Sequence, residues 1–326
     1  MSNLQVLRLL LCAGLAALAA LLLSLLSGSV DITVGDLLAY TTRSLSPLET
    51  QVLADIRIPR SVAAFTTGAG LALAGVLMQV LLRNPLADPY ILGLSGGAAV
   101  AALACITLGY AGLWLSSAAL FGALASVILV FSIAGRAGHW STVRLLLTGV
   151  VLSAGWGALI NLMLATSASA SVQGMLFWLM GDLSQSRAGW LQWSVLVMGS
   201  GVALLNARTL NVLVRGESSA ASLGVNVGSL RLALFFGASL LTAMAVMTAG
   251  SVGFVGLIVP HMLRLLGARD HRLLIPLSVL SGGAFLVLAD TLARTLLAPQ
   301  QLPVGVITAL IGVPSFILIL RSTPSQ

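Results

Sequence analysis

The 326-residue sequence contains no lysine, and all 16 of its basic residues are arginine. A phosphate-binding Walker loop requires a lysine that reaches the terminal phosphates of a nucleotide, and a Schiff base also forms on lysine. The chain is therefore excluded as a Walker-type ATPase and as a Schiff-base enzyme. Any ATP-driven work that involves it requires another subunit to hydrolyse the nucleotide.

Charge is also scarce: only 8% of the residues are charged, whereas 58% are hydrophobic and the mean hydropathy is +1.06. A soluble domain carries about 25% charged residues. The chain is therefore predicted to lie in a lipid bilayer. The arginines stand singly or in small groups and form no basic stripe, so the net charge of +7 does not indicate nucleic acid. Cys12 and Cys105 lie far apart in apolar runs, which argues against a disulfide framework or a metal pair.

Apolar runs long enough to cross a hydrocarbon core need ~20 residues. Ten runs qualify, and they predict an all-α, polytopic membrane protein: 4–26, 61–82, 91–110, 113–135, 143–166, 190–207, 229–250, 251–268, 273–297 and 303–321. The eighth run is short and contains Pro260, so it is expected to be broken or only partly membrane-crossing. The whole chain, 1–326, is predicted to be a single transmembrane domain.

The placement of arginine predicts the orientation, because cytoplasmic loops are enriched in basic residues. With ten spans and both termini in the cytoplasm, 11 arginines fall inside and 5 outside. The inner ones are Arg8, Arg83, Arg136, Arg144, Arg208, Arg215, Arg231, Arg264, Arg269, Arg272 and Arg321; the outer ones are Arg43, Arg57, Arg60, Arg187 and Arg294. Two loops are long: 27–60 outside, with a predicted surface helix in TVGDLLAYTT, and 208–228 inside.

Composition leaves a channel, a transporter and a membrane enzyme open. The three histidines do not form a metal-spaced set, which makes an enzyme a poor interpretation. An ion- or proton-coupled secondary transporter stays as the alternative from a different class. Such a protein needs acidic groups within its spans, and the sequence places none near the middle of a span; Asp290 lies towards an outer end.

Eight segments in order resemble the FecCD family of ABC-transporter permeases. They are IRIPR (56–60), LRNPLADPYILGLSGGA (82–98), STVRLLLTGV (141–150), FWLMGDLS (177–184), GESSAASLGVNV (216–227), GFVGLIVPHMLRLLGARDHRLLIP (253–276), LADTLAR (288–294) and LPVGVITALIGVPSFILIL (302–320). Each segment alone is weakly specific, but their order covers most of the chain. Tyr90 and the pair Gly96–Gly97 are small departures from the family pattern.

The resemblance implies a type II ABC importer permease fold, in a bacterial inner membrane, that works by alternating access. It implies a homodimer, two cytoplasmic ATPase subunits that bind ATP and magnesium, and a periplasmic binding protein. The chain itself is expected to hold no cofactor or metal and to have no catalytic residues. The expected cargo is an iron chelate, with haem first and a ferric siderophore second, and cobalamin is the alternative. No residue selects among these chelates.

The inner loop RGESSAASLG matches the family's coupling segment. Glu217 begins a run of small, helix-tolerant residues, and Gly224 is placed to end the helix in a left-handed conformation. An ordinary capped turn is the plain alternative. The predicted coupling residues, which would transmit ATPase closure to the spans, are Glu217, Ser218, Ala221, Leu223 and Gly224.

Positive charge on the outer side runs against the usual bias. In the resembled family, an outer arginine pocket receives a glutamate from each lobe of the binding protein, and Arg57, Arg60 and Arg294 match it. Guanidinium groups hold carboxylates through paired hydrogen bonds. The alternative is local pairing, of Asp290 with Arg294 one helical turn away and of Asp55 with Arg57.

The resemblance also places a cytoplasmic gate in two loops. Asn84, Pro85 and Leu86 follow the second span, and Ser141 and Thr142 precede the fifth. Asn-Pro favours a turn, so a structural turn is the alternative. The fifth span is the best candidate to line the pathway, through Ser153, Asn161 and Thr166.

Overall fold

The computed structural model describes residues 3–42, 45–135 and 142–322, and this part of the chain is helical without a β-strand. In order, the elements are α1 (Asn3–Leu26), α2 (Val34–Thr41), α3 (Pro47–Gln51), the π-helical segment η1 (Val52–Arg57), α4 (Ile58–Leu81), the 3₁₀ turn η2 (Pro89–Leu92), α5 (Leu94–Thr107), α6 (Leu113–Ala134), α7 (Thr142–Thr166), α8 (Ser169–Leu179), α9 (Trp190–Leu205), α10 (Ala207–Val214), α11 (Glu217–Ser222), α12 (Val227–Ala249), α13 (Val255–Leu265), α14 (His271–Thr295) and α15 (Val304–Ser322).

The predicted ten-span pattern corresponds to ten apolar segments among the described residues. Six helices are long and apolar enough to cross a membrane, and the bent pair α9–α10 adds a seventh. Three shorter apolar helices, α5, α13 and α15, occupy the positions of the third, eighth and tenth predicted spans. The prediction of an all-α polytopic fold is confirmed.

Three spans differ from their predicted bounds. The eighth is α13, which has 11 residues and contains Pro260, so the expectation of a short span is confirmed. The third is shorter than predicted, because η2 precedes it and α5 has 14 residues. The sixth bends by 64° between α9 and α10, so the inner loop predicted at 208–228 contains most of α10 and all of α11.

Helix α4 lies at the centre of the molecule, and almost every residue from Arg60 to Leu81 is buried. It packs against α12, α13 and α14. Glycines permit this close packing: a Cβ at Gly68 would lie 2.2 Å from the Gly282 carbonyl oxygen of α14. A Cβ at Gly75 would lie 1.8 Å from the Gly256 carbonyl oxygen of α13. Small residues draw membrane helices together because they let the backbones touch.

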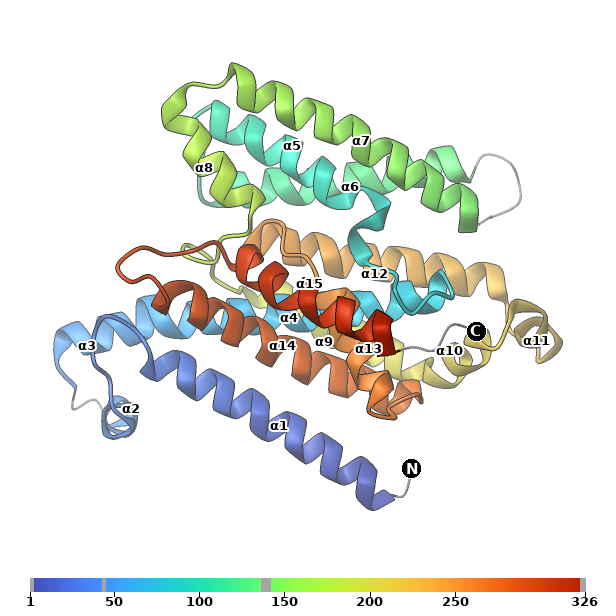
Figure 1. The fold of residues 1–326 in the computed structure, drawn as a ribbon, viewed down its shortest axis with the longest axis horizontal. Coiled ribbons are helices and arrows are strands. Elements are labelled where there is room, and N and C mark those ends of the chain that lie inside the picture. Colours follow the sequence, from blue (N-terminus) through green and yellow to red (C-terminus); the bar gives the residue numbers. More distant parts are fainter. Residues whose placement is uncertain (1–2, 43–44, 136–141, 323–326) are drawn as a thin grey trace.

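The remaining helices surround this centre (Figure 1). Helices α5, α6, α7 and α8 form a group on one side, and α1 packs along α14 on the opposite side. α1 begins, and α15 ends, at the end of the bundle that carries α11. This end is called the inner end here, after the arginine bias of the sequence, and the opposite end, with α2 and α3, is called the outer end.

The predicted surface helix in the outer loop is confirmed as α2. Thr33 and Asp36 form a capping box, in which the Thr33 backbone N–H donates to Asp36 at 2.7 Å and the Asp36 N–H donates to the Thr33 hydroxyl at 3.3 Å. The hydrogen bonds from Thr33 lower the pKa of Asp36 below its ordinary value. The sequence did not predict α3 or η1, which run directly into α4.

Candidate coupling and docking sites

Helix α11 stands at the inner end, and its C-terminal cap has the geometry that the sequence predicted. Gly224 has φ +80°, its N–H donates to the Ala221 carbonyl at 2.9 Å, and the Val225 N–H donates to the Ala220 carbonyl at 3.0 Å. This pair of bonds is a Schellman motif, which favours glycine because a Cβ is disfavoured at that φ. Ala220 faces inward, whereas Ser218, Ala221, Leu223 and Gly224 are exposed. The helix therefore has a small exposed surface at the inner end.

Glu217, the first residue of α11, is directed at the permease itself. Its carboxylate accepts from Arg231 of α12 and lies 3.2 Å from Nη2 of Arg83, the residue that follows the end of α4. Glu217 thus connects α11 both to the central helix and to the start of α12. In the structure its carboxylate pairs with Arg231 and Arg83, and its predicted role in coupling to an ATPase stays a prediction.

Arg83 has an unusual backbone conformation, with φ +49°. It occupies the left-handed position that ends α4: its N–H donates to the Val80 carbonyl at 3.2 Å, and the Asn84 N–H donates to the Gln79 carbonyl at 3.1 Å. Glycine is the usual residue at this position, because a side chain adds strain. Arginine stands here, and its guanidinium reaches Glu217. Nothing in the sequence pattern predicts this role for Arg83.

One of the two predicted gate loops is described in full. Asn84 and Pro85 are exposed, and the Asn84 side-chain oxygen accepts the Leu86 N–H at 2.9 Å, which closes the turn that Asn-Pro predicted. In the other loop, Ser141 lies outside the described residues, and Thr142 is the first residue of α7. The gate therefore stays a prediction.

Gln79 anchors the first gate loop from behind, and sequence reasoning missed it. This buried amide on α4 donates to the Ala87 carbonyl at 3.4 Å and to the Gly256 and Leu257 carbonyls at 3.3 Å. Its oxygen accepts from the guanidinium of Arg264 on α13. A lone glutamine in an apolar run was the available signal, since buried amides need partners.

The predicted pathway residues lie on α7, which is the least buried of the six long apolar helices. Ser153, Asn161 and Thr166 are exposed. Ser153 and Thr166 donate to carbonyls of their own helix, at 2.8 Å and 2.9 Å. Their hydroxyl hydrogens are therefore already used within α7. Their lining role stays a prediction.

Arg57, Arg60 and Arg294, three of the five outer arginines, lie close together, and their side chains are directed into the protein. Arg57 is 4% exposed and Arg60 is 7% exposed. Arg57 donates to the Leu25 carbonyl at 2.7 Å, and Arg294 donates to the Ser27 carbonyl at 2.8 Å. These carbonyls belong to the C-terminal end of α1, where helix carbonyls lack intrahelical partners and the dipole favours cations. The two arginines therefore cap α1.

Arg60 and Arg294 also share the carboxylate of Asp290, which is 1% exposed. Two nitrogens of Arg60 each donate at 2.9 Å to a different carboxylate oxygen, and Nε of Arg294 lies 3.9 Å from Oδ2. The alternative of local pairing between Asp290 and Arg294 is confirmed. Docking of a partner's carboxylate stays a prediction, and it would require these guanidinium groups to exchange partners.

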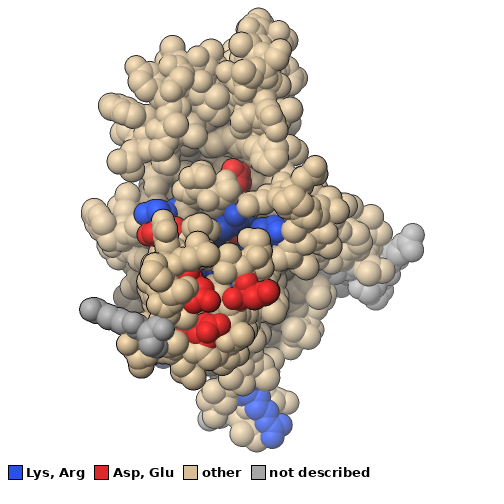
Figure 2. Space-filling view, turned by 90° about the vertical axis from the view of Figure 1, so that its left-hand side faces the viewer, with Lys and Arg blue, Asp and Glu red and all other residues tan. Residues whose placement is uncertain are grey.

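The accessible charge at the outer end is mostly acidic. Asp31 and Asp55 are exposed, and Asp36 and Glu49 are partly exposed. Figure 2 views this end and shows acidic side chains gathered on it. Since three of the outer arginines are buried or nearly so, they offer much less surface than their sequence positions suggest.

Ten apolar segments, nine of them arranged around the buried glycine-rich helix α4, together with an exposed capped helix at one end, define a polytopic membrane permease. The comparisons with known proteins agree. The chain matches the FecCD transport family over residues 16–322, and it belongs to this family.

Three relatives are informative. The chain is 46% identical over 273 residues to the cobalamin import system permease protein BtuC of Halobacterium salinarum. The aligned region covers 83% of this chain and 73% of the relative. It is 39% identical to the vitamin B12 import system permease protein BtuC of Escherichia coli O127:H6, over 97% of this chain and 95% of the relative. A solved inward-facing metal-chelate type ABC transporter matches with a TM-score of 0.86 and 31% identity, over 97% and 99% of the two chains. The chain is thus an ABC importer permease of type II fold.

Proposed function

We propose that this chain is the membrane-spanning subunit of a cobalamin importer in the bacterial inner membrane. The observation that carries the proposal is the similarity to vitamin B12 permeases along 97% of the chain. Two copies would enclose the pathway, two separate ATPases would bind ATP and magnesium, and a periplasmic binding protein would deliver the cargo.

The expected order of cargoes is corrected accordingly. The sequence placed haem first and a ferric siderophore second, and the named relatives give neither any support. Cobalamin, the alternative, fits them better. The error has a physical origin: the pathway of a bulky chelate is lined by small and apolar groups, which carry no signature of the metal or the macrocycle.

Three observations support this arrangement of partners, two from the structure and one from the sequence. The exposed α7 has the apolar composition of a helix that a second copy would cover. The exposed side of α11 suits docking into an ATPase groove. The absence of lysine requires that ATP hydrolysis takes place on another subunit. Both termini would lie in the cytoplasm, beside α11.

The proposal is tested by uptake in cells that lack their own cobalamin permease and that express this chain with its cognate ATPase and binding protein. Labelled cobalamin is expected to enter in an ATP-dependent manner, and excess haem or ferric siderophore should not compete. Uptake of haem or siderophore without cobalamin uptake would overturn the choice of cargo. Transport without any ATPase would instead favour the secondary transporter.

The strained arginine at the end of α4 leads to a prediction about coupling. Arg83→Gly removes a surface ion pair worth ~0–1 kcal/mol and relieves strain of similar size. The thermal stability of the variant is therefore expected to equal or exceed that of the parent. Transport per ATP hydrolysed should fall at least about fivefold, the lower end of typical coupling energies. Melting temperature, ATPase rate and uptake in proteoliposomes measure the two effects.

Arg269→Ala serves as the control, because Arg269 is another exposed arginine on the predicted inner side. It should leave the transport ratio unchanged. Glu217→Gln should reproduce the defect of Arg83→Gly from the other side of the ion pair. Parental coupling in both Arg83→Gly and Glu217→Gln would show that this contact does not transmit movement.

The outer arginines lead to a second prediction, which separates docking from capping. Changing all three would also break the buried Arg60–Asp290 pair, so the double variant Arg57→Gln/Arg294→Gln is preferable. If these groups receive carboxylates of the binding protein, its affinity should fall more than about tenfold, mostly at low salt, where charges are less screened. Titration of the binding protein at two salt concentrations measures this. Unchanged affinity of the folded variant would leave only the capping of α1.

A further inference from the structure

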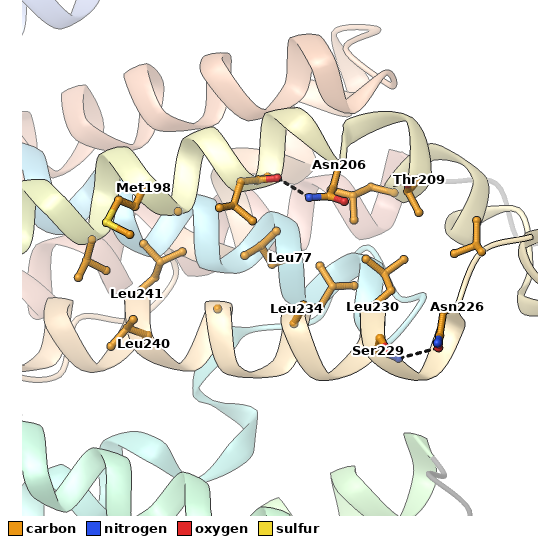
Figure 3. Close-up of a pocket in the computed structure, with 18 of the residues that line it drawn as sticks. Leu77, Met198, Asn206, Thr209, Asn226, Ser229, Leu230, Leu234, Leu240 and Leu241 are labelled. Carbon is orange, nitrogen blue, oxygen red and sulfur yellow. Dashed lines mark hydrogen bonds between the residues drawn. The ribbon is translucent and has the colours of Figure 1, made fainter.

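A cavity of about 660 Å³ lies between α9–α10 and α12, with Leu77 of α4 at its back. Figure 3 shows Met198 and Leu241 at one end and Asn206, Thr209, Asn226 and Ser229 at the other. Its volume falls within the ~300–1,000 Å³ of protein ligand sites. The coupling, gate and docking residues described above, apart from Gly224, do not line it.

The fold explains why this space is empty of protein. α9 bends by 64° at Asn206 and α10 leaves the side of α12. Below the bend, small residues face each other: Gly199 and Ala203 on α9, and Ala233 and Gly237 on α12. Such residues let two helices approach closely, and the two walls meet at Gly199, where an added Cβ would lie 3.3 Å from Leu241. Elsewhere along this face the cavity separates them. Val202, Met198 and Leu240 on the walls are 56%, 69% and 41% exposed, so the cavity opens to the outside of the bundle.

The cavity has the dimensions and the polarity of one membrane leaflet. From Ser229 to Leu240, its wall on α12 extends about 17 Å at the 1.5 Å rise of a helix. Half of a bilayer's hydrocarbon core is about 15 Å thick. The wall is apolar over this length, and its polar groups gather at the inner end, next to α11.

The charge around the inner end selects the kind of lipid. Arg208 of α10 and Arg215, which follows α10, are exposed, and Arg208 is the chain neighbour of Thr209 in the cavity wall. The chain has 11 of its 16 arginines on the predicted inner side. Basic sites between membrane helices on this side bind anionic headgroups. We propose that the α9–α12 cavity binds an anionic phospholipid of the inner leaflet, with an acyl chain along the groove and the headgroup near Asn206 and Thr209.

The lipid would touch the segment that follows the coupling helix, because Gly224, Val225 and Asn226 form part of the wall. A bound acyl chain would fill the space between α9 and α12 and would support this segment from the membrane side. The proposal concerns a lipid site, and it holds whichever cargo the permease carries.

The experiment uses the full complex in nanodiscs of phosphatidylglycerol and phosphatidylethanolamine, with a trace of phosphatidylglycerol that carries a diazirine in one acyl chain. After irradiation, crosslinks are mapped to peptides. They are expected to concentrate on 195–206 and 226–241. Unlabelled phosphatidylglycerol should displace the probe better than phosphatidylcholine does.

Ala233→Phe fills the cavity from an exposed position on α12 and should lower labelling about tenfold, a loss of ~1.4 kcal/mol in binding. Val202→Phe fills it from the α9 wall and should act alike, which protects the test if one variant folds poorly. Ala125→Phe is the matched control, on an exposed face of α6 away from the cavity. Labelling spread evenly over the exposed helices, or unchanged in both filling variants, would overturn the site. Equal displacement by phosphatidylcholine would overturn the anionic headgroup.

Discussion

Gly75→Ala is expected to abolish stable folding of the permease. The added Cβ would lie 1.8 Å from the Gly256 carbonyl oxygen and 2.5 Å from its carbonyl carbon. Both atoms are backbone, so no side-chain rotation relieves the contact, and α4 would have to separate from α13. Overpacking a core costs about 1–3 kcal/mol, and more where the backbone must move. We expect a loss of at least ~3 kcal/mol here, visible as a large fall in melting temperature in detergent and in the yield of monodisperse protein.

Gly70→Ala is the matched control on the same helix. Its Cβ would lie 3.8 Å from the nearest atom, the Leu241 carbonyl oxygen, which is an ordinary contact. Since alanine favours helix by about 0.5–1 kcal/mol over glycine, this variant should be as stable as the parent or slightly more stable. If Gly75→Ala melted like Gly70→Ala, the close approach of α4 and α13 would be wrong.

Asp290→Leu is expected to cause the second-largest loss of folding stability. It leaves the guanidinium of Arg60 buried without its carboxylate, and it removes the acidic neighbour of Arg294. Breaking a buried ion pair on one side costs about 3–5 kcal/mol, because the remaining charge lacks both water and a partner. The melting temperature should fall accordingly, and α1 should detach more readily, since Arg294 would lose part of its alignment on Ser24 and Ser27.

The double variant Arg60→Met/Asp290→Leu tests the cause. Replacing both charges by apolar side chains removes the unpaired guanidinium, and such replacements are often neutral. Most of the lost stability should return. Asp55→Asn, at an exposed outer position, should change stability by less than ~0.5 kcal/mol. A double variant as unstable as Asp290→Leu would show that the carboxylate acts through something other than charge pairing.

The structure explains why Arg57, Arg60 and Arg294 stand on the outer side of the membrane protein. The positive charges that run against the usual bias are used to cap α1 and to neutralise Asp290. Figure 2 shows a group of acidic side chains on this face, with arginines visible beside them. A binding protein that docks there would encounter the carboxylates of α2, α3 and η1 and the exposed Arg187 before it reached the buried guanidinium groups of Arg57 and Arg60.

Several features could be predicted from the sequence because they depend on neighbouring residues. The apolar runs determined the membrane class and the ten segments, since the length of a span is set by the thickness of the bilayer. Gly224 predicted the cap of α11, because that motif is closed by bonds within a few residues. The surface helix in TVGDLLAYTT was also predicted, and the structure shows that its capping box of Thr33 and Asp36 is equally local. The missing lysine alone excluded a Walker ATPase.

Other features were decided only by the tertiary structure. Arg60 meets Asp290 across 230 positions, and Arg57 meets the end of α1 across 32. The contact of Gly75 with Gly256, the network of Gln79 and the cavity beside Ala233 likewise join distant segments. Hydropathy could not predict them, because it measures how favourably a segment enters lipid and not which other segment it packs against. The partner of a buried charge and the spacing of two helices depend on which side chains meet, and that is determined by packing.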